Sequence, residues 1–177
     1  MLDKAVVMML LENTGITLYM TLVSTIAAYV LGLPMGIALV ITAEDGLRPN
    51  KLIYKLIDII VNVVRSVPFL ILLILVIPLT RAIVGKAYGP TATIVPLVLA
   101  AAPFIARMVE SSLLEVDNGV IEAAQSMGAS LWTIIVKVML GEARTSLVVG
   151  ATIVLGTVLG YSAMAGIVGG GGLGDIA

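Results

Sequence analysis

The segment NTGITLYMTLVSTIAAYVLGLPMGIALVITA, residues 13–43, contains no Asp, Glu, Lys or Arg. A helix of about 20 apolar residues crosses the hydrocarbon core of a bilayer, because each residue adds about 1.5 Å. A charged side chain at the centre of such a helix costs about 2.5 to 3.5 kcal/mol. A charge-free run of this length therefore predicts a membrane-spanning helix.

Three more charge-free runs, residues 66–80, 87–106 and 145–174, extend this prediction along the chain. The run 66–80 is short, so it spans only if its helix extends backwards past Arg65, whose long side chain can reach the interface. Composition agrees, because 12% of the 177 residues are charged, against about 25% in soluble domains. We expect an all-α fold: a polytopic transmembrane bundle with four spans, forming a single domain over residues 1–177.

The distribution of basic residues predicts the orientation. They concentrate in the connections after the first and third spans: Arg48, Lys51, Lys55, Arg107, Lys137 and Arg144. The amino end and the second connection carry fewer: Lys4, Arg81 and Lys86. Because Lys and Arg accumulate in cytoplasmic loops, we expect the amino terminus outside and residues 117–140 inside the cell.

Two residue types are missing from the sequence. It contains no Cys and no His, so thiolate nucleophiles, sulfur metal sites and the usual general base near neutral pH are excluded. It also lacks the GxxxxGK[ST] phosphate loop, so any ATP must be bound by another protein. We expect a chain that is not an enzyme, with no cofactor, no metal and no nucleic-acid partner.

A narrow polar stripe follows residue 50. Lys51, Lys55, Asp58, Asn62 and Arg65 recur at helical spacing among aliphatic residues. Either the helix lies in the cytoplasmic interface with this stripe toward water, or it spans the membrane with the stripe toward a wet cavity. We favour the interface for residues 51–58, and expect Asn62 and Arg65 to face a path through the bundle.

Helix signals mark other boundaries. We expect a short interfacial helix at the amino end, followed by a separate spanning helix. Asn13 or Thr14 is a candidate cap for the spanning helix, which should end near Thr42. Two GxxxG pairs, Gly32 with Gly36 and Gly156 with Gly160, predict close helix packing. The glycines of residues 169–174 satisfy GxGxxG but lack the strand and acid of a dinucleotide site, and we interpret them as a flexible outer loop.

Residues 117–140 predict two short helices joined by a tight turn, here called the elbow. Asp117 or Asn118 can cap the first helix, Gly128 can end it in the left-handed conformation, and Ser130 can cap the second. The second helix presents an apolar face with Trp132 placed at the interface. The pattern alone leaves open an ordinary helical loop or a protruding docking element.

A resemblance favours the docking element. Glu122-Ala123-Ala124, with Gly128 beyond, resembles the EAA motif of permease subunits from bacterial importers driven by ATP-binding cassettes. In that family the motif forms a coupling helix that sits in a groove of the partner ATPase. The resemblance implies coupling roles for Glu122, Ala123, Ala124, Met127 and Gly128, with Glu122 pairing with a cation and the two alanines permitting close approach. The family's Leu-Pro pair is replaced here by Leu140 and Gly141.

Three further segments narrow the resemblance. RSVPF (65–69), AAPFIARMVE (101–110) and GYSAMAGIVGGGGLG (160–174) are together similar to permeases of methionine importers. That implies a type I ABC importer permease fold in the bacterial inner membrane, with Met164 at a gate and Tyr161 and Ser162 beside it. It also implies a permease homodimer, two ATPases on the cytoplasmic side, an external substrate-binding protein and methionine as substrate. Such permeases carry a fifth spanning helix after the glycine-rich segment.

Two other classes of function remain as alternatives. A self-contained transporter or channel driven by an ion gradient usually places ionisable groups at mid-membrane, and the charge-free runs contain none. A membrane scaffold or assembly protein would need no glycine-rich segment. Co-purification of an ATPase through residues 120–139 separates an importer subunit from both.

Overall fold

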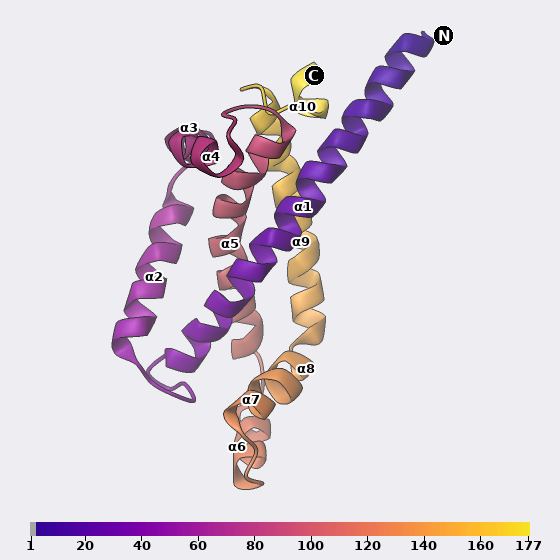
Figure 1. Ribbon diagram of the computed structural model, residues 1–177. Coiled ribbons are helices and arrows are strands. Elements are labelled where there is room, and N and C mark those ends of the chain that lie inside the picture. The colour runs from indigo at the N-terminus through magenta and orange to yellow at the C-terminus, as the bar shows by residue number, and fades with distance from the viewer. Residues whose placement is uncertain (1–2) are drawn as a thin grey trace.

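The computed structural model describes residues 3–177, and every regular element in that range is helical (Figure 1). This confirms the all-α class. The elements are α1 (Lys4–Thr42), α2 (Lys51–Ser66), α3 (Phe69–Leu75), α4 (Ile77–Val84), α5 (Pro90–Leu114), α6 (Asn118–Ser126), α7 (Leu131–Thr133), the π-helix η1 (Ile134–Met139), α8 (Leu140–Glu142), α9 (Arg144–Gly166) and α10 (Leu173–Ile176).

Within residues 3–177, three helices, α1, α5 and α9, are long and apolar enough to cross a membrane. The predicted second span differs, because α2 and α3 meet at a bend of 106° instead of forming one straight rod. Counted together, this broken pair brings the number of spans to four. The expectation of a helix running backwards past Arg65 is correct for α2, but the apolar run 66–80 does not continue it.

Pro68 explains the bend. A proline clashes with helical backbone at the residue before it, and Val67 accordingly has φ −85° and ψ 124°, which is extended. Helix α2 therefore ends at Ser66, and α3 restarts at Phe69 in a new direction. Arg65 and Phe69 thus lie on either side of a corner in the chain.

Helices α1 and α5 make the closest approach in the bundle. A Cβ atom on Gly32 would lie 2.6 Å from the Ala102 carbonyl oxygen, and one on Gly36 would lie 2.6 Å from that of Ala106. The first GxxxG pair is therefore a packing motif, as predicted. Added Cβ atoms on Gly156 and Gly160 would meet nothing within 4 Å, so the second pair packs against no part of the described chain.

The amino-terminal boundary prediction was wrong. Helix α1 is continuous from Lys4, and Asn13 and Thr14 lie inside it. Asn13 Nδ2 donates to the Met9 carbonyl at 2.9 Å and Thr14 Oγ1 to the Leu10 carbonyl at 2.7 Å. Residues that favour caps can also bond the carbonyl four positions back, and here their side chains do so within an unbroken helix.

The glycine-rich segment is packed, which corrects the expectation of a flexible loop. Gly169, Gly171 and Gly172 have positive φ, and a Cβ on Gly172 would lie 2.6 Å from Thr17 Oγ1. The Leu173 N–H donates to Thr17 Oγ1 at 2.9 Å. The segment follows helix α9, and these contacts fasten it to α1.

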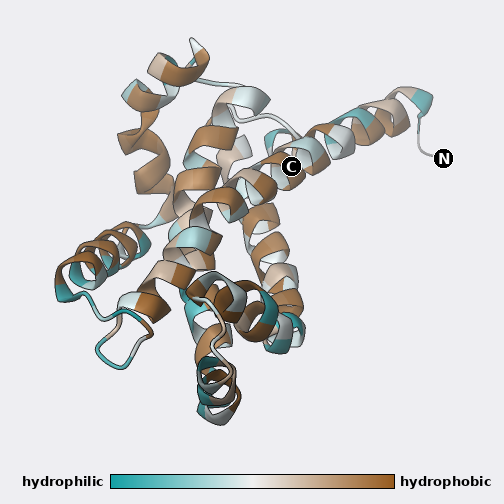
Figure 2. Ribbon diagram, turned by 60° about the horizontal axis from the view of Figure 1, so that its bottom comes forward, coloured by the Kyte–Doolittle hydropathy of each residue, from teal (hydrophilic) through white to brown (hydrophobic). Residues whose placement is uncertain are grey.

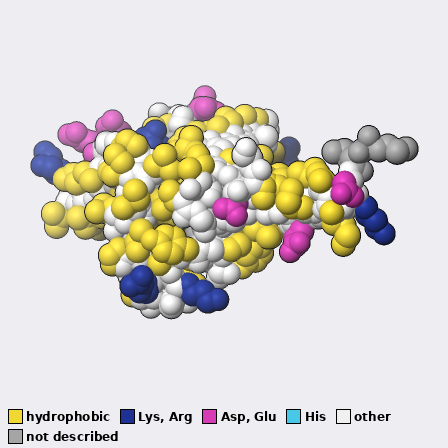
Figure 3. Space-filling model, turned by 90° about the horizontal axis from the view of Figure 1, so that it is seen from above, with side chains coloured by type: hydrophobic (Ala, Val, Ile, Leu, Met, Phe, Trp, Pro, Cys, Tyr) yellow, Lys and Arg dark blue, Asp and Glu magenta, His cyan; other side chains and the backbone are white. Residues whose placement is uncertain are grey.

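The helices divide the molecule into two ends. Figure 1 shows the elbow helices α6 to α8 below the bundle, whereas α3, α4, α10 and the amino end of α1 lie at the opposite end. In Figure 2 hydrophobic colour follows the helices, while hydrophilic colour concentrates at loops and helix ends. Seen from above, hydrophobic side chains cover much of the surface and charged ones lie mostly at its edges (Figure 3).

We predict that Gly36→Val weakens the bundle, because its side chain would collide with the Ala106 carbonyl and with Val109. Overpacking of this kind costs about 1 to 3 kcal/mol, and the melting temperature of the purified protein in detergent should fall. Gly15→Val is the control in the same helix, since nothing lies within 4 Å of a Cβ there. Equal melting temperatures for the two variants would contradict this account.

Candidate functional site: the elbow and the cavity at the helix bend

Backbone caps define the first half of the elbow. Asp117 Oδ1 accepts from the Gly119 N–H at 2.6 Å at the start of α6. At its end the Ala129 N–H bonds the Ala124 carbonyl at 3.0 Å and the Gly128 N–H bonds that of Gln125 at 2.9 Å. This pair of bonds is the Schellman motif, which places a left-handed residue after the helix, and Gly128 has φ +75°. The predicted capping by Asp117 and turn at Gly128 are confirmed.

The outer surface of α6 contains most of the predicted coupling residues. Glu122, Ala123 and Gly128 are exposed, and Met127 is 81% exposed. Ala124 is different, because it is only 5% exposed and packs into the core cluster of this chain. The expectation of a common alanine face is therefore wrong at Ala124, and Ala123 alone of the pair is on the outside.

The second half of the elbow is less regular than predicted. Ser130 Oγ accepts from the Thr133 N–H at 3.2 Å, which confirms the cap. After one α-turn the backbone becomes the π-helix η1 and then the short α8. Ile134, Ile135 and Met139 are buried while Trp132 is 73% exposed. Long π-helical runs are rare, and side-chain spacing in the sequence does not distinguish them from α-helix.

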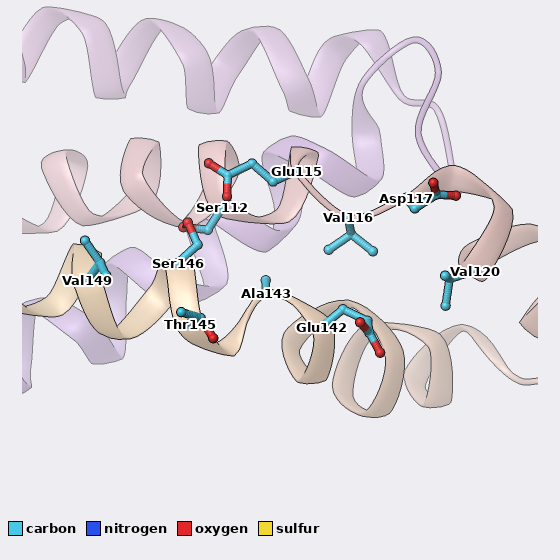
Figure 4. A pocket seen from close by; sticks show the side chains of 10 residues that line it. All are labelled: Ser112, Glu115, Val116, Asp117, Val120, Glu142, Ala143, Thr145, Ser146 and Val149. Carbon is cyan, nitrogen blue, oxygen red and sulfur yellow. The ribbon is translucent and has the colours of Figure 1, made fainter.

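A cavity of about 550 Å³ lies where the elbow joins the bundle (Figure 4). The Ser146 hydroxyl of α9 donates to the Ser112 hydroxyl of α5 at 2.9 Å, which ties the two spans together above the elbow. The cavity is lined by three acids, Glu115, Asp117 and Glu142. In residues 3–177 no group of three or more His, Cys, Asp or Glu is arranged to hold a metal ion.

A charge network connects α2 to α5. Arg107 of α5 donates to Asp58 of α2, to Asn62 Oδ1 at 2.9 Å and to Glu110 Oε2 at 2.6 Å. The Arg107 side chain is 22% exposed. The interface interpretation of residues 51–58 is therefore wrong at Asp58, which faces a neighbouring helix. Asn62 likewise binds Arg107 and does not line the cavity at the bend.

That second cavity, of about 240 Å³, lies inside the corner between α2 and α3. Its lining combines the cation of Arg65 with three aromatic side chains, Phe69, Phe104 and Tyr161. The Phe69 and Tyr161 rings are stacked, with centroids 4.6 Å apart and planes at 4°. We call this site the bend cavity.

The predicted gate residues Tyr161, Ser162 and Met164 lie in different environments in the structure. Tyr161 lines the bend cavity, and Met164, three residues further along α9, is 44% exposed. Ser162 is 1% exposed and its hydroxyl donates to the Leu159 carbonyl at 2.7 Å. The Ser162 side chain is thus enclosed within the bundle of this chain, and its place beside the gate stays a prediction.

Sequence reasoning did not identify Arg107, Phe69 or Phe104 as site residues. The spacing of Arg107 and Glu110, three residues apart on one helix, was an available signal for their ion pair. The partnership of Arg107 with Asp58 and the meeting of Phe69 with Tyr161 depend on tertiary packing, and no local pattern marks them.

Comparisons with known proteins place the chain. Residues 28–177 match the model of the family described as binding-protein-dependent transport system inner membrane component. The chain is 50% identical to the probable D-methionine transport system permease protein MetI of Vibrio cholerae over 96% of its own length and 75% of the relative's. It is 49% identical to the D-methionine transport system permease protein MetI of Escherichia coli K12 over 93% and 76% of the two lengths.

Solved structures agree with the sequence matches. A crystal form of the MetNI methionine ABC transporter in inward-facing conformations superposes with a TM-score of 0.97 at 48% identity, covering 99% of this chain and 81% of that one. An amino acid ABC transporter superposes with a TM-score of 0.75 at 21% identity over 99% and 81% of the two chains. The second similarity extends the fold beyond close relatives.

We predict that Arg107→Gln loosens α2 from α5, since it leaves the Asp58 and Glu110 carboxylates without their cation. Polar contacts between membrane helices contribute about 1 to 2 kcal/mol, so the melting temperature in detergent should fall. Arg81→Gln serves as the control, because Arg81 is exposed and lies on α4, outside the network. A double variant with Asp58→Asn should lose less than the sum of the two single losses, and simple additivity would argue against the network.

Proposed function

The chain belongs to the family of binding-protein-dependent transport system inner membrane components, and we propose that it is the permease subunit of an ATP-driven methionine importer. The observation that carries this proposal is the TM-score of 0.97 with the MetNI methionine ABC transporter at 48% identity. Sequence identity of 49–50% to D-methionine permeases supports the same substrate. The chain forms the path, and a partner ATPase hydrolyses ATP.

The elbow is the proposed docking element for that ATPase, on the cytoplasmic side of the inner membrane. Glu122, Ala123 and Met127 project from it. The loop of residues 43–50 approaches from the bundle side, and a cavity of about 320 Å³ lies between this loop and the elbow. Both cytoplasmic connections are thus within reach of one partner. Two ATPases would serve two copies of the permease.

Coupling follows from how the elbow is joined to the spans. Val116 precedes α6 and Ala143 precedes α9, and both are buried in the core cluster. Displacement of the elbow by the closing ATPase therefore acts on α5 and α9 together. Packed helices move as bodies between discrete arrangements, so α9 carries Tyr161 and Met164 with it as the path opens to one side and then the other.

A permease homodimer is part of the proposal. Gly156 and Gly160 of α9 leave a face that no other described residue covers, and small residues favour close helix association in membranes. Met164 lies further along the same helix and, as in the resemblance, would narrow the path between two copies. An external binding protein would deliver methionine at the opposite end, where the amino terminus lies.

The rival transporter driven by an ion gradient gains no support. Asp58 of α2 and Glu110 of α5 are both ion-paired with Arg107. A proton or sodium relay needs carboxylates that exchange their partner ion during transport.

The proposal is tested by reconstituting the permease with its ATPase and binding protein in liposomes. We expect methionine uptake that requires ATP, and Gly128→Val should lower the number of methionine molecules transported per ATP. A β-branched residue at φ +75° costs about 1 to 2 kcal/mol in backbone strain, which distorts the turn.

Gly141→Val is the matched control, because Gly141 lies in α8 with open space around it and no positive φ. It should preserve the coupling ratio. Uptake that persists without the ATPase would refute the proposed function, and an unchanged ratio in Gly128→Val would refute the coupling role of the elbow.

The homodimer and gate are tested by cross-linking, which the absence of native Cys makes clean. Met164→Cys should form an intermolecular disulfide under mild oxidation, because the two copies of Met164 face each other across the path. Leu52→Cys is the control, since Leu52 is 80% exposed on α2, away from that face. Equal cross-linking of both variants would indicate random collision and contradict the gate.

A further inference from the structure

We infer that the bend cavity is an amino-acid subsite in which Arg65 binds the carboxylate and the side chain lies against Phe69, Phe104 and Tyr161. This inference rests on the proposed function and adds to it the group that recognises the substrate inside the membrane. Four observations support it: the unpartnered cation, its depth, the chemistry of the walls and their connection to α9.

Arg65 is a cation without an anion. The ion pairs found in residues 3–177 are both made by Arg107, and Arg65 has no acidic partner in that range. The other residues lining the bend cavity are apolar or aromatic. Arg65 lines this cavity although its side chain is exposed in the single chain, and an unpaired charge within a membrane segment marks a functional site by default. A mobile anion would pair with this charge for as long as it stays bound.

The depth of the cavity identifies the source of that anion. Arg65 lines the cavity together with Ala100 and Phe104, which lie about 15 to 21 Å from either end of α5 at 1.5 Å per residue. Lipid phosphates lie at the membrane surfaces, outside the hydrocarbon core. A cavity wall near the middle of α5 therefore favours an anion in transit through the protein over a lipid phosphate.

The walls suit an amino acid with an apolar side chain. A guanidinium binds a carboxylate through two parallel hydrogen bonds. A thioether gains further contact energy against aromatic rings, and the stacked Phe69 and Tyr161 rings lie beside Arg65. The volume of about 240 Å³ is below the roughly 300 to 1,000 Å³ of sites for drug-sized ligands. The bend cavity therefore fits a small metabolite.

The cavity is built from elements that the proposed mechanism moves. Arg65 and Phe69 are on either side of the bend at Pro68, whereas Tyr161 belongs to α9, three residues before Met164. Movement of α9 against the bend therefore separates the Tyr161 wall from the Arg65 cation. Substrate affinity would then differ between the inward-open and outward-open states, as alternating access requires.

The test uses a cysteine reporter in the full complex of permease and ATPase, without the binding protein. Ala100→Cys places a single permease thiol in the cavity wall, since the chain has no native Cys. Its labelling by a maleimide is followed on the separated permease, with increasing methionine or methionine amide. Val148→Cys, 67% exposed on α9 and not a lining residue of the cavity, is the reporter control.

We expect methionine to slow the labelling of Ala100→Cys but not of Val148→Cys, and the amide, which lacks the carboxylate, to have no effect. Adding Arg65→Gln should raise the methionine concentration for half-protection about 10- to 100-fold, as loss of a charge-assisted hydrogen bond does. Arg65→Lys, which keeps the charge but loses the two-pronged geometry, should fall between. Arg81→Gln removes the same charge outside the cavity and should change nothing.

Three outcomes would overturn the inference: no protection by methionine, equal protection by the amide, or full protection in Arg65→Gln. Arg65 makes no ion pair with the described residues 3–177, so equal melting temperatures of Arg65→Gln and Arg81→Gln should accompany the test. If Arg65→Gln alone melts lower, the Arg65→Lys result decides: protection equal to the parent overturns the inference. Methionine uptake by the parent complex, measured separately, distinguishes failure of this subsite from failure of the proposed function.

Discussion

The contact between α1 and α5 is the constraint on which the bundle depends. Gly32 and Gly36 bring one backbone against the carbonyls of Ala102 and Ala106, at a separation that leaves no room for a Cβ atom. Lipid offers no hydrophobic driving force between helices, so close packing must hold them together. Helices α2 and α9 then pack against this pair. The bend cavity and the cavity where the elbow joins the bundle lie where this packing is interrupted.

Both interruptions are built into the backbone. Beside the middle of α5, Pro68 turns the chain through the corner that opens the bend cavity. Beyond the end of α5, the Schellman turn at Gly128 reverses the chain and leaves a short helix projecting from the bundle. The buried Val116 and Ala143 connect that projection to α5 and α9. Under the proposed function, a force applied to the elbow and a substrate in the bend cavity would therefore act on the same helix, α9.

Local patterns in the sequence were sufficient to predict the fold class and the caps and turn of the elbow. The charge-free runs predicted the class, a bundle of membrane-spanning helices. Asp117, Gly128 and Ser130 predicted the caps and the turn of the elbow, because caps and turns depend on residues close by in the sequence. The predictions failed where distant packing decides. Asp58 was expected to face water, but it binds Arg107 of another helix. Asn13 was expected to cap a helix, but the helix continues through it. The glycines of residues 169–174 were expected to form a flexible loop, but they pack against Thr17 and α9. The π-helix in the elbow could not be predicted, because the spacing of side chains in the sequence does not distinguish it from an α-helix.

Helix α1 has a consequence for the membrane itself. Its 39 residues measure about 58 Å at 1.5 Å each, almost twice the roughly 30 Å hydrocarbon thickness. It runs obliquely, and its amino end extends beyond its neighbours (Figure 1), with exposed apolar side chains from Val6 to Leu11. A helix with such surplus length adapts to bilayer thickness by tilting. Because α1 is locked to α5, a thinner or thicker bilayer would change the inclination of the bundle as a unit, and lipid composition becomes a variable in how it works.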